Sequence, residues 1–520
     1  MMRAMRLLLV PFVLTAAALG TELATAAPLP HVPRYGVFEQ SIGFTPSSGN
    51  PWEDVTLGVT IEPPHGRQVE IGGFYAGGHT WKFRFAPSQL GRYTWTARIA
   101  DRTRVATRHG AFLVVTGPSP GFVQRDPHNR FRWTFSDGES YDALGIQDCT
   151  LPVYTDDPLT GFGFDGGQGP PHWTSLEPYL KTFAAAGFDL FRWGPDNCSF
   201  DLYDRIDPAG NVYSQQGGIT ADELVSSLRR HGFRIEFVLF GNTPPFPSGT
   251  DAQLAAVERY VRYVVARYGA SVDFWELMNE ARVSDGWYAQ VAAYLRRIDP
   301  YRHPIGTSYS RPDLPGIDFG SDHWYQNEPE LESDSTAWHR LRAESARRYG
   351  KPTFVDEQGN AQRNWDPGSS VRMRLRAWTA FFAEATFVFW NTSATKHYFA
   401  DEAANIYLGP EERGYVRVLL RWMRGFDPRA HFVTPSVPGR SDLRAYALRG
   451  PKEYGLYIVD GASHSTQVTG ATVVVSPAHA GRAVWTDPAS GRTLRVRNVP
   501  AGRQTLAVPP FTTDVALKIA

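Results

Sequence analysis

The sequence predicts an α/β protein: a (β/α)8 TIM barrel flanked by an N-terminal and a C-terminal β-sandwich. A chain of 520 residues is long enough for several domains. Its middle alternates amphipathic helical patterns with short apolar runs, as βα units around a parallel sheet do. Both flanking regions carry only short alternating runs separated by Gly and Pro, which is typical of β-sandwiches. The expected organisation is a signal peptide at 1–26, a β-sandwich at 34–118, a barrel at 140–426 and a second β-sandwich at 430–520.

The first 26 residues have the pattern of a secretory signal peptide. Arg3 and Arg6 precede the apolar stretch 7–20, and Ala24-Thr25-Ala26 follows as a cleavage site of small residues. The alternative is a buried N-terminal helix. We therefore expect a secreted protein, extracellular or associated with the cell wall. No membrane span is expected, because no stretch of the sequence reaches about 18 apolar residues.

The N-terminal β-sandwich is predicted from four alternating runs, at 55–59, 81–85, 93–97 and 111–115. No helical pattern interrupts them. The turn-rich segment 117–121, Gly-Pro-Ser-Pro-Gly, then marks a linker. The C-terminal β-sandwich is predicted in the same way from runs such as 454–459 and 471–475.

The barrel is predicted from eight candidate strands in the middle of the chain. They lie near 142–147, 188–193, 234–240, 273–278, 304–308, 317–322, 352–356 and 386–390. Eight parallel strands fit a TIM barrel, and a doubly wound open sheet is the alternative. The fifth and sixth strands are so close in sequence that their crossover helix should be reduced to a loop.

Four glycines support the βα reading, because each stands between a helical pattern and the next strand. Glycine after the last helical residue adopts a left-handed conformation at little cost and so ends the helix. The four are Gly187, Gly232, Gly269 and Gly350.

Two glutamates stand where the mouth of the barrel should be. Glu280 follows the fourth strand in the run Phe274–Glu280, and Glu357 follows the seventh in Phe354–Asn360. Barrel active sites lie at the carboxyl ends of the strands, and the fourth and seventh strands are nearly opposite each other. Two carboxylates that face each other across a barrel are the apparatus of glycoside hydrolysis. The alternative is that both are surface loop residues.

The Asn279-Glu280 pair, together with Glu357, resembles the retaining β-glycosidases of the (β/α)8 clan that contains the family 5 cellulases and mannanases. The resemblance implies that Glu280 is the acid/base and Glu357 the nucleophile. It also implies that Asn279 hydrogen-bonds the sugar 2-hydroxyl. A retaining enzyme, which works by double displacement, would hold the two carboxyl groups about 5–5.5 Å apart. An inverting enzyme would hold them about 6.5–9.5 Å apart.

The same resemblance implies further substrate-site residues. Tyr325 of His323-Trp324-Tyr325 would orient Glu357, and His323 would line the site. Trp390 would be an aromatic platform for a sugar, with core packing as the alternative. Arg192 would keep the nucleophile ionised, although the clan often supplies this Arg from another strand; a structural ion pair is the alternative.

The flanking regions also have a family likeness. Residues 72–82 and 91–95 resemble an uncharacterised β-sandwich domain that precedes cellulase-like barrels. The C-terminal region resembles a β-domain that follows such barrels and is described, by similarity, as collagen-binding. Only the barrel motif bears on chemistry.

Three further polar residues lie near the predicted site, and each needs a separate interpretation. Glu276 should be a buried charge lower in the barrel, paired with an Arg. Asp356 should point away from the site, unless a β-bulge exchanges it with Glu357. Asn197, just past the second strand, either binds sugar hydroxyls or belongs to a turn.

Cys149 and Cys198 follow the first two predicted strands, which are neighbours in a barrel. In an exported protein they are predicted to form a disulfide beside the cleft, with two free buried thiols as the alternative. A loop of this length, once closed, contributes about 4 kcal/mol in the chain-entropy model.

The composition and motifs exclude some classes of function. With 53 Lys and Arg against 53 Asp and Glu, the chain lacks the basic surplus of a dedicated nucleic-acid binder. There is no HExxH or His-x-His pattern at a strand end, so a metal-dependent hydrolase is disfavoured and no cofactor is expected. The expected partner is a neutral poly- or oligosaccharide. The alternative function is a non-catalytic carbohydrate-binding or adhesion protein, and the sequence indicates no sugar identity or oligomeric state.

Overall fold

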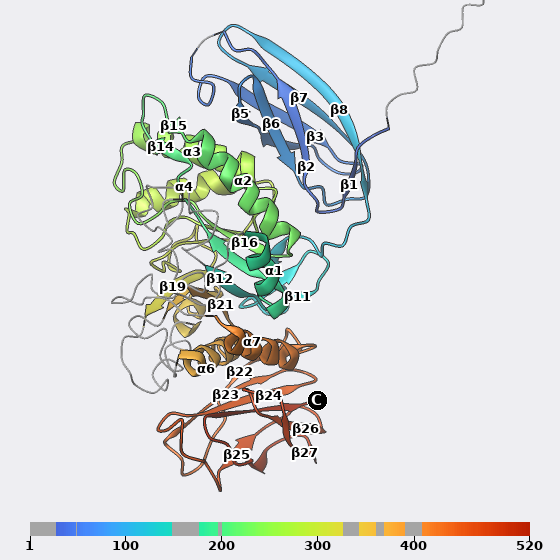
Figure 1. The fold of residues 1–520 in the computed structure, drawn as a ribbon, viewed down its shortest axis with the longest axis vertical. Coiled ribbons are helices and arrows are strands. Elements are labelled where there is room, and N and C mark those ends of the chain that lie inside the picture. The colour runs from blue at the N-terminus through green and yellow to red at the C-terminus, as the bar shows by residue number, and fades with distance from the viewer. Residues whose placement is uncertain are drawn as a thin grey trace, which may run out of the picture.

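A computed structural model shows the fold of the chain (Figure 1). It describes residues 28–47, 49–147, 176–195, 200–325, 343–359, 369–390 and 408–520, except for the side chains of residues 324, 325, 358, 359 and 369. The predicted signal peptide at 1–26, Cys149, Cys198 and Asn197 lie outside the described residues. Their assignments therefore stay predictions.

Eight parallel strands form one sheet in the middle of the molecule. The first strand in sequence pairs with the last, as a barrel requires and a doubly wound sheet does not. Among the described residues no pairing joins β18 to β19, so the barrel is nearly closed. In sheet order the strands are β18 (Ile305–Gly306), β17 (Phe274–Glu276), β16 (Arg234–Val238), β13 (Leu190–Trp193), β12 (Leu144–Gln147), β21 (Ala385–Trp390), β20 (Thr353–Gly359) and β19 (Gly320–Tyr325).

Each of the eight predicted strands overlaps one of these observed strands. The short crossover is confirmed as well, because residues 307–319, between β18 and β19, contain no helix. The opening of the barrel therefore lies where the connection was predicted to lack its helix.

Helices cover the outside of the barrel, and a short ribbon extends from the loop after β13. None of the described helices combines the length and the apolar composition that a membrane crossing requires. The helices are α1 (Leu176–Ala186), α2 (Gln215–Arg230), α3 (Asp251–Tyr268), α4 (Asp285–Ile298), α6 (Ser369–Phe382) and α7 (Pro410–Met423), and the ribbon is β14 (Tyr203–Arg205) with β15 (Val212–Tyr213).

Three of the four predicted helix-ending glycines have the expected left-handed backbone. The φ angle is 104° at Gly187, 85° at Gly232 and 69° at Gly350. The prediction is wrong for Gly269, which stays right-handed with φ −56°. There a Cβ atom would lie 2.6 Å from the carbonyl oxygen of Val265, so close contact rather than backbone handedness favours glycine.

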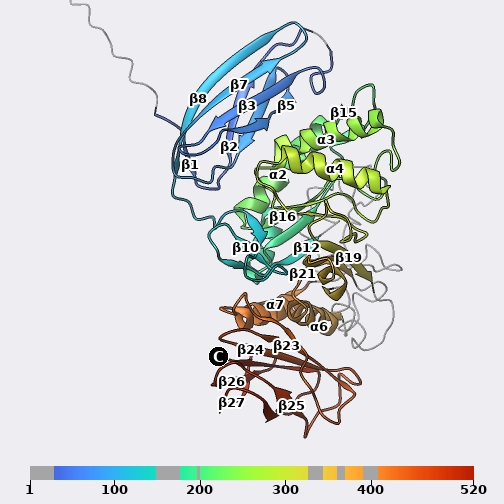
Figure 2. The same ribbon diagram turned by 180° about the vertical axis from the view of Figure 1, so that it is seen from behind.

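A small antiparallel sheet closes the amino-terminal end of the barrel, beside β12 (Figure 2). Trp133 of this sheet packs edge-on against Phe274, Phe319 and Phe354 from three barrel segments. Its indole nitrogen donates a hydrogen bond to Thr386, at 3.0 Å. The sheet consists of β9 (Val123–Arg125), β10 (Trp133–Phe135) and β11 (Ser140–Tyr141). We call it the plug; no pattern in the sequence predicts a sheet at this place.

Two sheets around one apolar core form the N-terminal sandwich, which lies beside α2 and α3 (Figure 1). The contact centres on Arg84, which pairs in bidentate fashion with Asp222 of α2 at 2.9 Å and donates to the carbonyl of Arg267 at 2.8 Å. The first sheet has the order β1 (His31–Pro33), β8 (Val105–Val115), β7 (Gly91–Ala100), β3 (Thr56–Glu62), β4 (Val69–Gly72), and the second β2 (Phe38–Gly43), β6 (Thr80–Phe85), β5 (Phe74–Gly77).

The C-terminal region is a six-stranded sheet with a two-stranded companion around a separate core. It joins the barrel through α6 and α7 (Figure 1). Arg374 of α6 pairs with Asp514 at 2.8 Å, and Trp378 stacks on Tyr457. The sheet order is β22 (His431–Val433), β23 (Leu443–Arg449), β24 (Tyr454–Asp460), β29 (Asp514–Ile519), β26 (Gly481–Thr486), β27 (Thr493–Val499), and the companion is β25 (Thr472–Val475) with β28 (Gln504–Ala507).

Candidate active site

Glu280 lies at the carboxyl end of β17, on a backbone that turns sharply after the strand. Its φ angle is 46°, a left-handed value that non-glycine residues seldom adopt and that occurs often at functional sites. The amide of Asn279 donates to the carbonyl of Phe240, and the amide of Glu280 to the hydroxyl of Ser308 at 3.3 Å. The Glu280 side chain is 30% exposed, so it is open to a ligand.

A β-bulge in β20 determines where Glu357 points. Along β19 the pairing runs Asp322 with Val355 and then His323 with Glu357, so Asp356 is the extra residue. As a result the side chains of both Asp356 and Glu357 enter the barrel, where they are 0% and 4% exposed. The expectation that Asp356 points away from the site is therefore wrong.

Arg192 connects these acidic groups from inside the barrel. Its side chain is fully buried and donates to Glu276 at 2.6 and 2.9 Å, to Glu357 at 2.5 Å and to the amide oxygen of Asn279 at 2.8 Å. Burial alone would lower the pKa of Arg192, but Glu276, Glu357 and Asp356 outweigh it and raise the pKa well above its ordinary value. A permanently charged guanidinium thus favours the ionised form of Glu357.

The ion pair between Arg192 and Glu276 confirms that Glu276 is a buried charge paired with an Arg. It also means that Arg192 faces carboxylates rather than solvent. The residue therefore lies behind the candidate site and can act on a substrate through Glu357.

His323 of β19 lies between the two candidate catalytic carboxylates. Its Nδ1 atom is 2.8 Å from Glu280 and 3.4 Å from Glu357, and its Nε2 atom is 3.4 Å from Asp356. Burial would lower the pKa of His323, but the charges of Glu357 and Asp356 and the hydrogen bond to Glu280 raise it to about 9. His323 is thus an imidazolium at neutral pH.

A layer of buried acids lies below this imidazolium. Glu236 of β16 is fully buried, and within the described part of the chain neither of its carboxyl oxygens has a hydrogen-bond partner. Burial, with the charges of Asp356 and Glu276 added, raises its pKa well above the ordinary value. Burial, with Glu276 nearby, also raises the pKa of Asp356. Both shifts favour the protonated, uncharged form of a carboxyl group in this layer.

The carboxylates of Glu280 and Glu357 face each other closely. One oxygen of each lies within 4.8 Å of the other and of a ring nitrogen of His323. By spacing alone these three groups could hold a metal ion. However, a protonated His323 has no free lone pair at Nδ1, and Glu357 already accepts from Arg192. The described groups thus fit proton transfer better than metal binding.

The structure places the other predicted site residues as follows. Asn279 is buried, with its amide between Arg192 and Asn242. Trp390 is half-buried at the end of β21, where it pairs with Gln147 of β12. The backbone of Tyr325 pairs with Gly359, two residues past Glu357, but its side chain is not among those described.

Sequence reasoning missed four residues that surround the carboxylates: Asn242, Gln147, Ser308 and Glu236. Gln147 accepts from Arg192, and Ser308 donates to Glu276 at 2.5 Å. One signal was available for Glu236, because it is a charged residue inside the apolar run of β16. Gln147 ends β12, and Asn242 and Ser308 lie in the loops just past β16 and β18, where the sequence pattern gave no signal for them.

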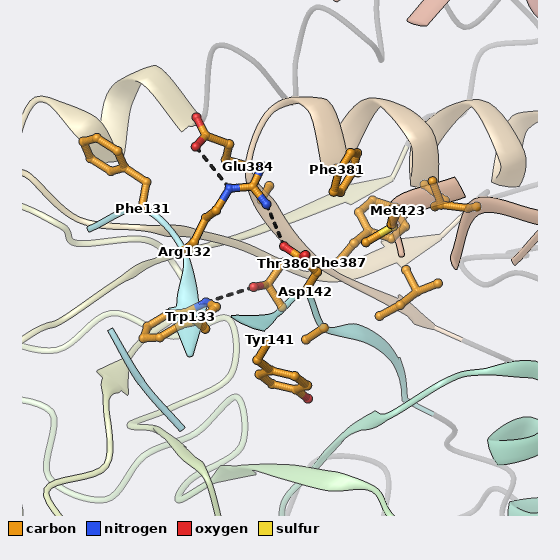
Figure 3. Close-up of a pocket in the computed structure, with 15 residues that line it drawn as sticks. Phe131, Arg132, Trp133, Tyr141, Asp142, Phe381, Glu384, Thr386, Phe387 and Met423 are labelled. Carbon is orange, nitrogen blue, oxygen red and sulfur yellow. Dashed lines mark hydrogen bonds and ion pairs between the residues drawn. The ribbon is translucent and has the colours of Figure 1, made fainter. Parts of the chain in front are cut away.

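A cavity at the other end of the barrel is separate from this site (Figure 3). It lies between the plug, the start of β21 and helices α6 and α7, and it holds about 30 Å³, room for a water molecule or two. There Arg132 pairs with Asp142 and Glu384, and its Nη2 atom has no partner among the described residues. A water bound to Nη2 would satisfy that donor.

The comparisons with known proteins address the fold. Residues 31–100 match the model of a family described as a domain of unknown function, DUF5060. Among curated proteins, no sequence matches this chain significantly. A solved structure from Bacteroides vulgatus, titled a "putative glycoside hydrolase", aligns with TM-score 0.65 and 17% identity over 94% of this chain and 99% of its own.

Two further solved structures align more loosely. A GH30 endoxylanase from Clostridium papyrosolvens covers 73% of this chain and 97% of its own, with TM-score 0.43 and 10% identity. A type I pullulanase from Bacillus subtilis covers 97% and 87%, with TM-score 0.46 and 11% identity. The alignment with the Bacteroides vulgatus structure shows that the chain has a glycosidase-like fold, which is a near-closed parallel barrel with flanking β-domains.

Proposed function

We propose that the protein is a retaining glycoside hydrolase of the cellulase and mannanase clan, acting on a neutral poly- or oligosaccharide. The observation that carries the proposal is the approach of the Glu280 and Glu357 carboxylates to within 4.8 Å, with His323 between them. Retaining enzymes hold their two carboxyl groups about 5–5.5 Å apart, whereas inverting enzymes leave about 6.5–9.5 Å for a water molecule.

In the first step Glu357 attacks the anomeric carbon as Glu280 protonates the departing glycosidic oxygen. The glycosidic bond breaks, and a covalent glycosyl ester forms on Glu357. In the second step Glu280 takes a proton from water, and the resulting hydroxide attacks the anomeric carbon. Glu357 leaves as a carboxylate, and Glu280 ends protonated, ready for another cycle.

The charges around the carboxylates suit these roles. The bond from Arg192 favours an ionised Glu357, as a nucleophile requires. His323 carries a proton at neutral pH and bonds to Glu280, so the pair holds the proton that acid catalysis needs. Asn279 uses one amide N–H on Asn242, and its second N–H is available for the sugar 2-hydroxyl.

Secretion and the bridge between Cys149 and Cys198 belong to the same proposal. Both rest on the sequence: the signal pattern at 1–26 and the positions of the cysteines after the first two strands. A protein that works on an external polysaccharide needs export, and a bridge beside the cleft would stiffen it.

A screen of aryl glycosides and polysaccharides tests the proposal, with Glu280→Gln and Glu357→Gln as site variants. The Glu223→Gln variant, on the exposed face of α2, is the matched control and should act as wild type. We expect Glu357→Gln to be inactive and Glu280→Gln to lose about 10²–10⁴-fold on poor leaving groups. The loss in Glu280→Gln should shrink for leaving groups that need no proton. Full activity of Glu357→Gln would refute the assignment.

A further inference from the structure

The charge of this neutral chain is unevenly distributed. Residues 431–520 contain ten Lys and Arg but five Asp and Glu, whereas the whole chain has 53 of each. The imbalance is concentrated in one segment: between Asp487 and Asp514 there are four arginines and no acidic residue. These are Arg492, Arg495, Arg497 and Arg503.

All four arginines are exposed on or next to β27, the edge strand of the C-terminal sheet. Arg495 and Arg497 are two residues apart in the strand, so both point to the same face. Arg492 precedes the strand, and Arg503 lies in the turn to β28. None of the four forms an ion pair in this fully described part of the chain, although Arg495 donates to the carbonyl of Ala507.

Helix α7 extends this basic surface. Arg417 and Arg421 are exposed, lie one helical turn apart and have no acidic partner among the described residues. The guanidinium of Arg421 lies 3.5 Å from the Cβ position of Gly491, just before Arg492. We call these six residues the arginine surface: Arg417, Arg421, Arg492, Arg495, Arg497 and Arg503.

Three other arginines of this region are neutralised by acidic partners. Arg429 pairs with Asp427 and Arg440 with Asp442, each at 2.6 Å, and Arg374 is buried against Asp514. What distinguishes the arginine surface is therefore its concentration of one sign, with four arginines and no acidic residue between Asp487 and Asp514.

Protection of an edge strand explains only part of this pattern. Charged side chains on an edge strand prevent pairing with a second molecule, and Arg495 and Arg497 serve that purpose. However, Arg492 and Arg503 lie outside the strand, and Arg417 and Arg421 lie on a helix, where no edge needs protection. A surface of one sign that spans a helix, a strand and two turns instead attracts an extended anion.

We propose that the arginine surface binds an anionic polysaccharide and so holds the enzyme on an acidic glycan matrix, apart from the neutral chain cleaved in the barrel. The choice of a glycan rests on the proposed function. A single-stranded nucleic acid fits less well, because it needs exposed aromatic rings for its bases. The only aromatic residue between Asp487 and Asp514 is Phe511, which is buried.

The test is salt-dependent binding of the mature full-length protein to polygalacturonate, with uncharged dextran and duplex DNA as comparison ligands. The main variant is Arg492→Gln/Arg495→Gln/Arg497→Gln/Arg503→Gln. Arg67→Gln/Arg92→Gln/Arg98→Gln/Arg108→Gln, which changes four exposed arginines of the N-terminal sandwich, is the charge-matched comparison. We expect wild type to bind polygalacturonate at low salt and to release it as salt rises. The main variant should bind at least tenfold more weakly, and the comparison variant should bind as wild type.

A second variant, Arg417→Gln/Arg421→Gln, changes a helix and leaves the edge strand intact. It should weaken binding at least threefold without changing solubility. Unchanged binding in both arginine-surface variants would overturn the proposal, as would tighter binding to DNA than to polygalacturonate. Aggregation of the main variant together with wild-type binding in the helix variant would show that the arginines only protect the edge.

Hydrolysis of an aryl glycoside separates this proposal from the proposed function. The arginine-surface variants should keep wild-type activity, because none of these residues lies at the barrel mouth. If Glu357→Gln stays active while polygalacturonate binding still depends on the arginines, the catalytic assignment fails and the arginine surface stands.

Discussion

His323 is the residue that couples the two proposed catalytic glutamates to the buried acids below them. Its ring contacts Glu280 and Glu357 on one side and Asp356 on the other. Because three carboxylates surround one ring, the imidazolium is the stable form up to about pH 9. Two predictions follow from this raised pKa, one on stability and one on activity.

Replacing His323 by Gln should remove a pH-dependent part of the folding stability. A His with a pKa raised from 6.5 to about 9 stabilises the fold fully below pH 6.5, and the contribution is lost as pH rises through about 9. Wild type should therefore lose more of its Tm than His323→Gln between pH 6 and pH 9.5. Exposed His65→Gln is the control and should follow wild type. Parallel Tm curves for wild type and His323→Gln would contradict the raised pKa.

Replacing Asp356 by Asn should move the alkaline limb of kcat/KM to lower pH. The Asp356 charge helps to raise the pKa of His323, so its loss lets the imidazolium deprotonate sooner. The limb, near pH 9 in wild type, is measured on an aryl glycoside. Asp313→Asn, at an exposed ion pair, should leave it in place. An unmoved limb in Asp356→Asn would mean that Asp356 does not act through His323.

At the residue scale, sequence could identify Glu280 and Glu357 because each follows an apolar strand at the predicted mouth. It could not locate Asp356, since strand parity places Asp356 and Glu357 on opposite faces. One extra residue in β20 brings both inward, and a bulge of this kind depends on pairing with β19 that no local pattern records.

Among the elements, the plug was hidden from sequence reasoning for a different reason. Its strands are only two or three residues long, too short for an alternating pattern. The eight barrel strands, by contrast, were predictable because buried apolar runs alternate with amphipathic helices. The ends of the strands were less predictable, because β20 extends to Gly359, beyond the predicted end at 356.

Trp133 should be the main support of the plug. It is buried against Phe274, Phe319 and Phe354 at the floor of the barrel. Trp133→Ala should lower the free energy of unfolding by about 3–5 kcal/mol, because it leaves a cavity where an indole was packed. Trp133→Phe keeps most apolar contact and loses the hydrogen bond to Thr386, at a cost of about 1 kcal/mol beyond the packing change. Denaturant unfolding measures the free energy of unfolding of both variants. If Trp133→Ala lost no more of it than Trp133→Phe, Trp133 would not be the main support of the plug.

For the molecule as a whole, ion pairs connect the barrel to its flanking domains, and the pair at the C-terminal junction is buried. Arg374 and Asp514 are 5% and 2% exposed, and Asp514 also accepts from Tyr457. No sequence pattern could pair residues this far apart. Likewise, the zero net charge of the chain conceals the basic C-terminal region, because a sum over the sequence carries no position.

Asp514→Asn should destabilise the protein by about 3–5 kcal/mol, because it leaves the Arg374 charge buried without its partner. Asp442→Asn breaks a partly exposed pair with Arg440 in the same domain and should cost about 0–1 kcal/mol. Thermal unfolding of both variants, followed in the same buffer, tests the difference. If Asp514→Asn is no worse than Asp442→Asn, the junction does not depend on this pair.

The central claim is that Glu357 forms a covalent bond to the sugar, and trapping that bond tests it most directly. The substrate from the aryl glycoside screen is remade as its 2-deoxy-2-fluoro analogue with a reactive leaving group, which slows breakdown of the glycosyl-enzyme. Peptide mass spectrometry then locates the label. The account predicts one sugar per chain, on the peptide that contains Glu357, and none in Glu357→Gln. A label on another residue, or turnover of the parent glycoside by Glu357→Gln, would contradict it.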